Sequence, residues 1–220
     1  MSDFWIKDGE RMLMIGDSIT EAGRRSTDAP FGHGYMRMFV ELVTSRYPDR
    51  NIEFLNRGVG GNTVQHLRDR WNEDVLTLKP DRMSLKIGIN DINKHLLGMP
   101  DGIDPDTYAK ILDELLNLTT SELGIPIVLL SPFYISTDRT GGHSYRSQVM
   151  DLLPRYIETV EEMSVKYSTK LLRTHEIFQE QLKYRDADVF IHGAVAADAI
   201  HPNHAGYMLI ADSLFRLLDE

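Results

Sequence analysis

The sequence predicts an α/β fold: a three-layer αβα sandwich with a central, mostly parallel sheet of about five strands. Three observations predict this fold. Short apolar runs of strand length alternate with longer segments of helical periodicity along the whole chain. Several apolar runs end in glycine-rich turns, as the strands of an open α/β sheet do. No repeat, low-complexity tract or linker divides the 220 residues, so we expect one domain spanning residues 1–220.

Apolar runs of strand length predict strands at residues 11–15, 52–55, 83–87, 125–130 and 171–172. Their apolar character suits strands of a parallel sheet whose two faces are both covered by helices. The first three are followed by turns rich in glycine and short polar residues, at 16–18, 56–63 and 88–91. Because the carboxyl ends of parallel strands lie at one edge of the sheet, we expect these turns to converge there.

Apolar residues at helical spacing predict helices at residues 35–47, 64–78, 105–123, 148–167, 176–182 and 207–218. Pro105 is placed to begin the third helix, and Gly124 to end it. Pro154 is expected to begin or to kink the fourth helix. The connecting segments 26–34, 98–106 and 136–147 are mainly polar and are expected to form loops at the rim of the site.

The composition excludes several classes of protein. The formal net charge of −9 disfavours binding to nucleic acid and to anionic membrane surfaces, which requires clustered Lys and Arg. The chain has no cysteine, so disulfides, thiolate nucleophiles and Cys-ligated metals are excluded. The first ten residues do not form a signal peptide, and no apolar run is long enough to span a membrane. These features predict a cytoplasmic protein, and we expect neither a metal nor another cofactor.

Ser18 is the candidate nucleophile. It follows the apolar run 12–15 on a tight Gly-Asp-Ser turn, which is where an α/β sheet presents a reactive serine. A different interpretation is that Ser18 only caps a helix, since Ser18 and Glu21 match the capping-box pattern. A serine hydroxyl is weakly nucleophilic until a base removes its proton, and His201 is the candidate base. Asp198, three residues earlier, can hold the other ring nitrogen of that histidine.

Acyl transfer also requires hydrogen-bond donors for the oxyanion that develops on the substrate. The backbone N–H of Ser18, the backbone N–H of Gly61 and the side-chain amide of Asn90 are the candidates. Three neighbouring residues are expected to brace these groups: Asp17, Asn62 and Asp91. Each of these patterns alone is commonly a turn or a helix cap. Their occurrence together, each after a strand or before a helix, favours the catalytic interpretation.

The four patterns together resemble the four signature blocks of the GDSL (SGNH) hydrolases. The matching residues are Gly16-Asp17-Ser18-Ile19, Gly61-Asn62, Gly88-x-Asn90-Asp91 and Asp198-x-x-His201-Pro202. The resemblance implies a flavodoxin-like SGNH hydrolase domain and metal-independent hydrolysis of esters or thioesters. It implies Ser18, Asp198 and His201 as the catalytic triad and Ser18, Gly61 and Asn90 as the oxyanion hole. Gly60 stands where the family commonly has Ser or Ala, so Gly60 and Gly61 are alternatives as the donor.

Within the family, the first three blocks are most similar to those of carbohydrate esterases, in particular acetyl-xylan esterases of the intracellular type. This similarity implies a serine esterase that removes short acyl groups, acetyl above all, from a small-molecule or oligosaccharide ester. Phe31, Phe133 and Tyr134 are expected near the site, available to stack on a sugar ring. The alternatives are a short-chain lipase, a lysophospholipase or a thioesterase of the same family.

Two further hypotheses come from other classes of protein. A metal hydrolase would use His192, Asp198, His201 and His204 as ligands. A non-catalytic carbohydrate-binding relative is expected to lack Ser18 or His201, and both are present. The sequence leaves open whether the chain forms a homo-oligomer. It also leaves open whether Phe4 and Trp5 pack on their own domain or on a partner subunit.

Overall fold

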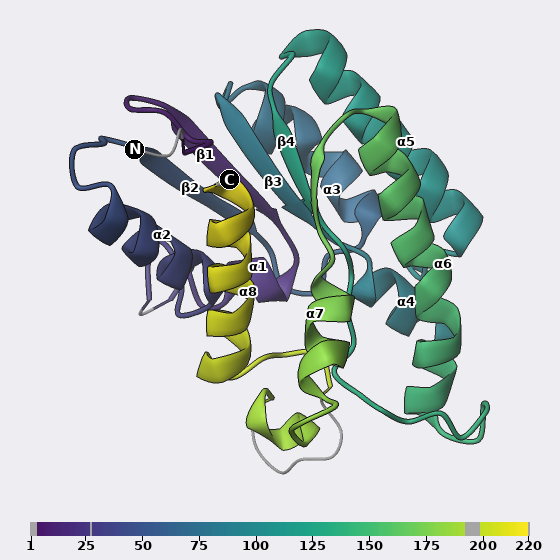
Figure 1. Cartoon of the computed structure of the whole chain (residues 1–220). Coiled ribbons are helices and arrows are strands. Elements are labelled where there is room, and N and C mark those ends of the chain that lie inside the picture. The colour runs from purple at the N-terminus through teal and green to yellow at the C-terminus, as the bar shows by residue number, and fades with distance from the viewer. Residues whose placement is uncertain (1–3, 27, 192–198, 220) are drawn as a thin grey trace.

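The computed structural model describes residues 4–26, 28–191 and 199–219. A five-stranded sheet in the order β2-β1-β3-β4-β5 forms the centre of the molecule, and all its neighbouring strands are parallel (Figure 1). The strands are β1 (Arg11–Gly16), β2 (Glu53–Gly58), β3 (Arg82–Lys86), β4 (Ile127–Leu130) and β5 (Lys170–Leu172). This confirms the α/β fold and the number of strands expected from the sequence.

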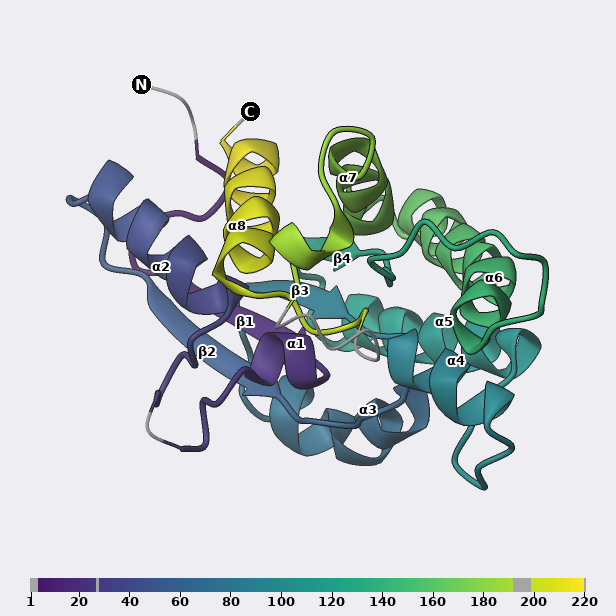
Figure 2. The same cartoon turned by 90° about the horizontal axis from the view of Figure 1, so that it is seen from below.

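Helices cover both faces of the sheet. On one face lie α2 (Tyr35–Arg46) and α8 (His204–Leu218); on the other lie α3 (Val64–Trp71) and α5 (Pro105–Glu122) (Figure 2). The helix α6 (Tyr145–Lys166) packs beside α5 and against α4 (Ile89–Leu96). Short helices complete the chain: α1 (Ser18–Glu21), a π-helical turn at Asn72–Leu76, α7 (Thr174–Gln181) and a 3-10 turn at Ala187–Val189. The strands are therefore shielded from water by two helical layers, as their apolar sequences require.

Several boundaries differ from the expected ones. Residues 56–58 continue β2 instead of forming a turn, because they pair in register with the end of β1. The helix α6 begins at Tyr145, since the side chain of Ser144 caps it, and Pro154 lies inside this helix. The segment 89–96, for which no helix was expected, forms α4 directly after Gly88. Asn90 and Asp91 therefore lie in the first turn of a helix.

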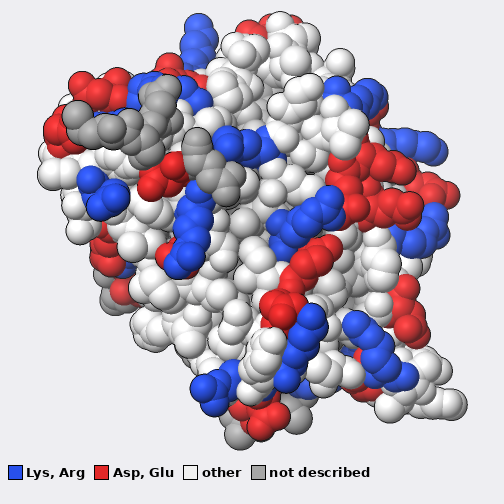
Figure 3. Space-filling view, viewed as in Figure 1, with Lys and Arg blue, Asp and Glu red and all other residues white. Residues whose placement is uncertain are grey.

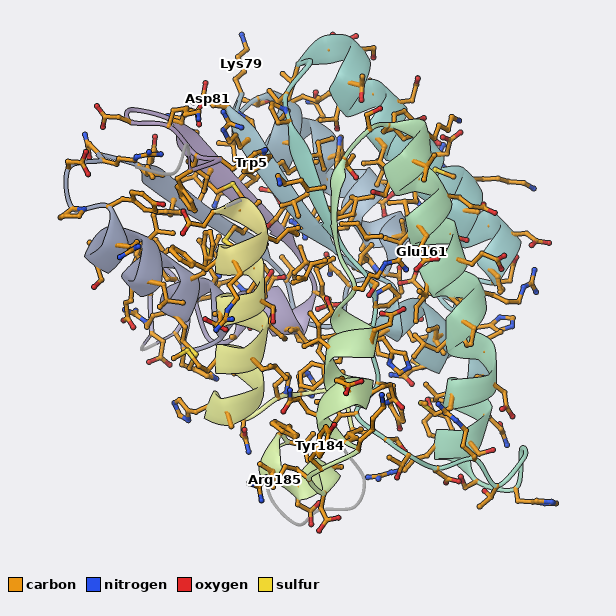
Figure 4. All side chains as sticks on the ribbon, in the orientation of Figure 1. Trp5, Lys79, Asp81, Glu161, Tyr184 and Arg185 are labelled. Atoms are coloured by element: carbon orange, nitrogen blue, oxygen red, sulfur yellow. The ribbon has the colours of Figure 1, made fainter. Side chains whose placement is uncertain are left out.

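The amino terminus packs on its own domain. Phe4 is fully buried and stacks on Tyr47, with ring centroids 4.6 Å apart. The guanidinium of Arg82 lies over the ring of Trp5 at 4.6 Å. Trp5 lies near the amino-terminal edge of the sheet, at the end of the molecule opposite Tyr184 and Arg185 (Figure 4). Of the two interpretations that the sequence left open for Phe4 and Trp5, the structure shows the intramolecular one.

Gly58 is required where the end of β2 meets α1. A Cβ atom built on Gly58 would lie 2.2 Å from the backbone nitrogen of Glu21, which is a severe overlap with main chain. We expect Gly58→Ala to lower the free energy of unfolding by about 1–3 kcal/mol, the usual range for overpacking, as measured by urea denaturation. Gly60→Ala is the matched control, because its Cβ would meet its nearest neighbour at 3.9 Å. Equal stabilities for the two variants would contradict the prediction.

Candidate active site

The turn after β1 presents Ser18 at the carboxyl-terminal edge of the sheet. Asp17 is the N-cap of α1, and its Oδ1 accepts a hydrogen bond from the backbone N–H of Ile19 at 3.0 Å. Ser18 is the first helical residue, so the interpretation of Ser18 itself as the helix cap is wrong. Because Asp17 performs the capping, the hydroxyl of Ser18 is directed to another partner.

That partner is His201. The Oγ of Ser18 lies 2.9 Å from Nε2 of His201, although the two residues are 183 positions apart in the sequence. Both side chains are partly exposed, so a substrate can reach them. When Nε2 is unprotonated it can accept the hydroxyl proton of Ser18, which is the geometry that activates a serine nucleophile. The predicted convergence of these two residues is therefore observed.

The position of His201 is fixed by the residues around the start of α8. Asn203 caps α8 through its Oδ1, which accepts a bond from the N–H of Gly206 at 3.1 Å. Its Nδ2 donates to the carbonyl oxygens of Val189 and Ile191, both at 3.0 Å. Asn203 thus ties the His201 turn to the segment that precedes it. Asp198, the predicted third member of the triad, lies outside the described residues.

The second and third blocks meet beside Ser18. A Cβ built on Gly60 would lie 3.9 Å from the Cβ of Ser18, which places this turn next to the serine. Gly61 has a φ of +77°, a conformation that favours glycine. Nδ2 of Asn90 donates to the carbonyl oxygen of Asn62 at 3.0 Å. An amide nitrogen carries two hydrogens, so this bond leaves a second hydrogen with which Asn90 can bind an oxyanion.

A buried ion pair lies beneath these residues, and the sequence analysis did not identify it. Nζ of Lys86 is 3.0 Å from Oδ2 of Asp17, and the two side chains are 1% and 0% exposed. The ammonium also lies 4.9 Å from the centre of the Phe133 ring. Burial lowers the pKa of Lys86, while Asp17 opposes this effect. The available signal was a lysine near the end of a strand predicted to be buried, since a buried charge requires a partner.

Asp91, in the third signature block, links α4 to the start of α3, which follows the second block. Its Oδ1 accepts a hydrogen bond from the backbone N–H of Val64 at 2.9 Å, at the start of α3. Its Oδ2 is buried and has no hydrogen-bond partner among the described residues. Burial raises the pKa of this carboxyl to about 7, against the lowering effect of the Val64 N–H bond. The bracing role expected for Asp91 thus has a specific contact.

Two predicted aromatic residues are not available to a substrate. Phe133 and Tyr134 are 0% and 1% exposed, and Phe133 packs on Phe178 with ring centroids 4.8 Å apart. The prediction that they stack on a sugar ring is wrong, because the segment after β4 turns into the core. Phe31 remains partly exposed.

A surface hollow of about 770 Å³ lies elsewhere, between α6 and β5. Its lining includes Glu158, Glu161 and Glu162, part of the acidic face of α6 (Figure 3). The lining contains no histidine and no residue of the Ser18 site. The pairing of Ser18 with His201 is therefore the better indication of where chemistry occurs.

The metal hypothesis has limited geometric support. Within the described ranges, no group of three or more His, Asp or Glu side chains is arranged to hold a metal ion. His192 and Asp198, two of the four residues in that hypothesis, lie outside those ranges.

None of the helices in the described part of the chain is long and apolar enough to cross a membrane.

Comparisons with known proteins show which family, sequences and structures this chain resembles. The model of the GDSL-like lipase/acylhydrolase family matches residues 14–209. An acetylxylan esterase from Geobacillus stearothermophilus is 33% identical over 219 residues, covering 96% of this chain and 94% of that protein. A crystal structure of an acetylxylan esterase from the same organism superimposes with a TM-score of 0.85 and 32% identity, covering 97% of this chain and 96% of the other. An α/β hydrolase from the metagenome of Lake Arreo gives a TM-score of 0.84 and 30% identity, with coverages of 98% and 97%.

The pKa of Asp91 predicts a pH-dependent stability. A carboxyl whose pKa rises from 3.8 to about 7 on folding is held more strongly as the neutral acid, so its contribution is complete below pH 3.8 and is lost as pH rises to about 7. Asp91→Asn mimics the neutral acid. We expect this variant to gain stability relative to the wild type between pH 4 and pH 8, by up to about 4 kcal/mol.

The measurement is urea denaturation of both proteins across this pH range. Asp17, Lys86 and Lys94 also act on the Asp91 charge and are retained in the variant. A stability difference that is constant with pH would contradict the prediction.

Proposed function

The chain belongs to the GDSL-like lipase/acylhydrolase family and is an ester-hydrolysing serine hydrolase, and we propose that it removes acetyl groups from carbohydrate esters through an acyl-enzyme intermediate. The observation that carries this proposal is the 2.9 Å contact between Ser18 Oγ and His201 Nε2. The contact supports a nucleophile and a base in this chain, and the acetylxylan esterase relatives support the substrate class.

In the proposed first step, Oγ of Ser18 attacks the acetyl carbonyl carbon while His201 Nε2 takes the hydroxyl proton. The tetrahedral intermediate collapses as His201 donates this proton to the sugar oxygen, and the sugar leaves with its hydroxyl restored. A water molecule then attacks the acetyl-enzyme, with His201 again as base, and acetate is released. Asp198 is proposed as the carboxylate partner of the other ring nitrogen of His201.

The structures of the relative support these assignments. Catalytic variants of the Geobacillus stearothermophilus acetylxylan esterase replace a serine, an aspartate or a histidine by alanine. The aspartate and the histidine replaced there lie three positions apart, as Asp198 and His201 do in this chain. The same spacing suits a carboxylate and an imidazole that share one turn before the last helix.

The oxyanion hole is proposed to consist of the backbone N–H groups of Ser18 and Gly61 and the amide of Asn90. The exposure of Gly60 and Gly61 lets a substrate approach the main chain closely. Gly61 is proposed because Gly61-Asn62 matches the second signature block, and Gly60, whose Cβ would lie 3.9 Å from that of Ser18, is the alternative. The bond from Asn90 to Asn62 orients the amide before the substrate arrives, which limits reorganisation during the reaction.

We expect Asn90→Ala to lower kcat by about 10²–10³-fold, the usual loss when one oxyanion donor is removed. The measurement is steady-state hydrolysis of a nitrophenyl acetate, with circular dichroism to show that α4 and the fold persist. His95→Ala is the control, since it changes a residue farther along the same helix that has no proposed role. A normal kcat for Asn90→Ala would remove Asn90 from the mechanism.

The substrate class is tested with nitrophenyl esters of increasing acyl length and with acetylated xylo-oligosaccharides. We expect acetyl esters to be preferred and free acetate to be released from the oligosaccharides. A lipase would bind long chains better, because each buried CH₂ contributes about 0.8 kcal/mol. Ser18→Ala should lower kcat for every substrate by several orders of magnitude. Activity that rises steadily to decanoyl esters, with acetylated sugars untouched, would contradict the carbohydrate assignment while leaving the Ser18 mechanism intact.

A further inference from the structure

The guanidinium of Arg70 contacts three separate segments that converge on Ser18. Its Nε donates to Oδ1 of Asn62 at 2.9 Å, and its Nη1 donates to the carbonyl oxygen of Arg57 at 2.9 Å. Its Nη2 donates to the carbonyl oxygen of Gly16 at 3.1 Å. Gly16 ends β1 and lies two residues before Ser18, whereas Arg57 lies near the end of β2 and Asn62 in the following turn.

Through Asn62 these contacts extend to the third block. The side-chain oxygen of Asn62 binds Arg70, while its backbone oxygen accepts the hydrogen bond from Asn90. We propose that Arg70 is a positioning residue, which holds the Ser18 turn in register with the Gly61 and Asn90 donors. This inference rests on the proposed function of the site.

The side chain of Arg70 is itself firmly held. It is 17% exposed and forms an ion pair with Asp74, four residues later. Asp74 lies in the π-helical turn Asn72–Leu76 and also contacts Nε of Arg57 at 3.4 Å. A π-turn inside a helix commonly occurs at functional sites. Asp74 thus orients Arg70 from behind, away from the reacting atoms.

An arginine suits this role better than any other residue. Its planar guanidinium carries five N–H donors in a fixed arrangement, so one side chain can bind several oxygens in different directions. A lysine in the same place has one nitrogen, which can satisfy Asp74 but cannot reach Gly16, Arg57 and Asn62 together. The geometry therefore depends on the shape of the side chain as well as on its charge.

The consequence for catalysis follows from how the donors are built. The serine and the two other donors come from turns after three different strands, and their mutual placement depends on contacts between these turns. A misplacement of about 1 Å can lower a rate by about 10²-fold. Oxyanion donors act mainly in the transition state, so loss of their alignment lowers kcat more than it raises KM.

The test compares Arg70→Ala with Arg68→Ala on acetyl esters. Arg68 lies on the same helix, but it is 46% exposed and pairs with Glu114 away from the site. Sites are counted by stoichiometric reaction of Ser18 with an organophosphonate, so that kcat is expressed per competent serine. We expect kcat per site to fall by up to about 10²-fold for Arg70→Ala, with KM little changed, and both values to be unchanged for Arg68→Ala.

Two further measurements separate positioning from stability. Free guanidinium at a low, non-denaturing concentration should raise the kcat of Arg70→Ala but not that of Arg68→Ala. Arg70→Lys should retain the charge beside Asp74 and most of the stability, yet keep a low kcat per site. If Arg70→Ala does not fold, Arg70→Lys and Asn62→Ala replace it, and each must lower kcat per site.

If Arg70→Ala, or the variants that replace it, has the same kcat per site as the wild type, the inference is overturned. The proposed function is not affected by that result. Full activity of Arg70→Lys would also overturn the inference, because the charge without the fork would then suffice. A wild-type protein that hydrolyses no acetyl ester would overturn the proposed function, and the inference with it.

Discussion

The buried pair of Lys86 and Asp17 is the interaction on which the geometry of the site depends. Neither charge could remain at the centre of the sheet alone, because removal of one partner leaves the other desolvated and unpaired. The register of β1 and β3 sets Gly16 opposite Lys86 and so brings the two side chains together. The second oxygen of Asp17 caps α1, so the same carboxylate fixes the strand and the turn that presents Ser18.

The floor of the site is a layer of buried charged residues, and the reacting groups above it are partly exposed. Asp17, Lys86 and Asp91 are almost completely buried and hold the backbone turns from below. Ser18, Asn90 and His201 are partly exposed and are the groups that a substrate can contact. A low-dielectric floor makes the interactions of its charged groups stronger and more rigid than they would be in water. The reacting groups are therefore held in a fixed orientation while they stay exposed to the substrate.

The family relationship accounts for the fold and the reaction class, but a fold alone does not determine a substrate. In this chain the main chain is exposed at Gly60 and Gly61, in the turn that lies next to Ser18. Three arginines, Arg24, Arg57 and Arg70, lie around the same turns, and two of them donate to backbone carbonyls there. The hydrogen bonds of Arg24 and Arg70 to the main chain stabilise the conformation of these turns.

The sequence by itself determined the alternation of strands and helices and the candidate residues Ser18, Gly61, Asn90 and His201, because local patterns of glycine, polar residues and apolar periodicity carry that information. Only the tertiary structure decided which residues are partners. The capping pattern pointed to Ser18, but Asp17 forms the cap; Phe133 and Tyr134 were expected in the site, but they belong to the core. Lys86 and Arg70 were not identified as organising residues. Lys86 contacts Asp17, 69 positions away, and Arg70 contacts Gly16, 54 positions away. No local pattern encodes a hydrogen bond that exists only after the strands have paired.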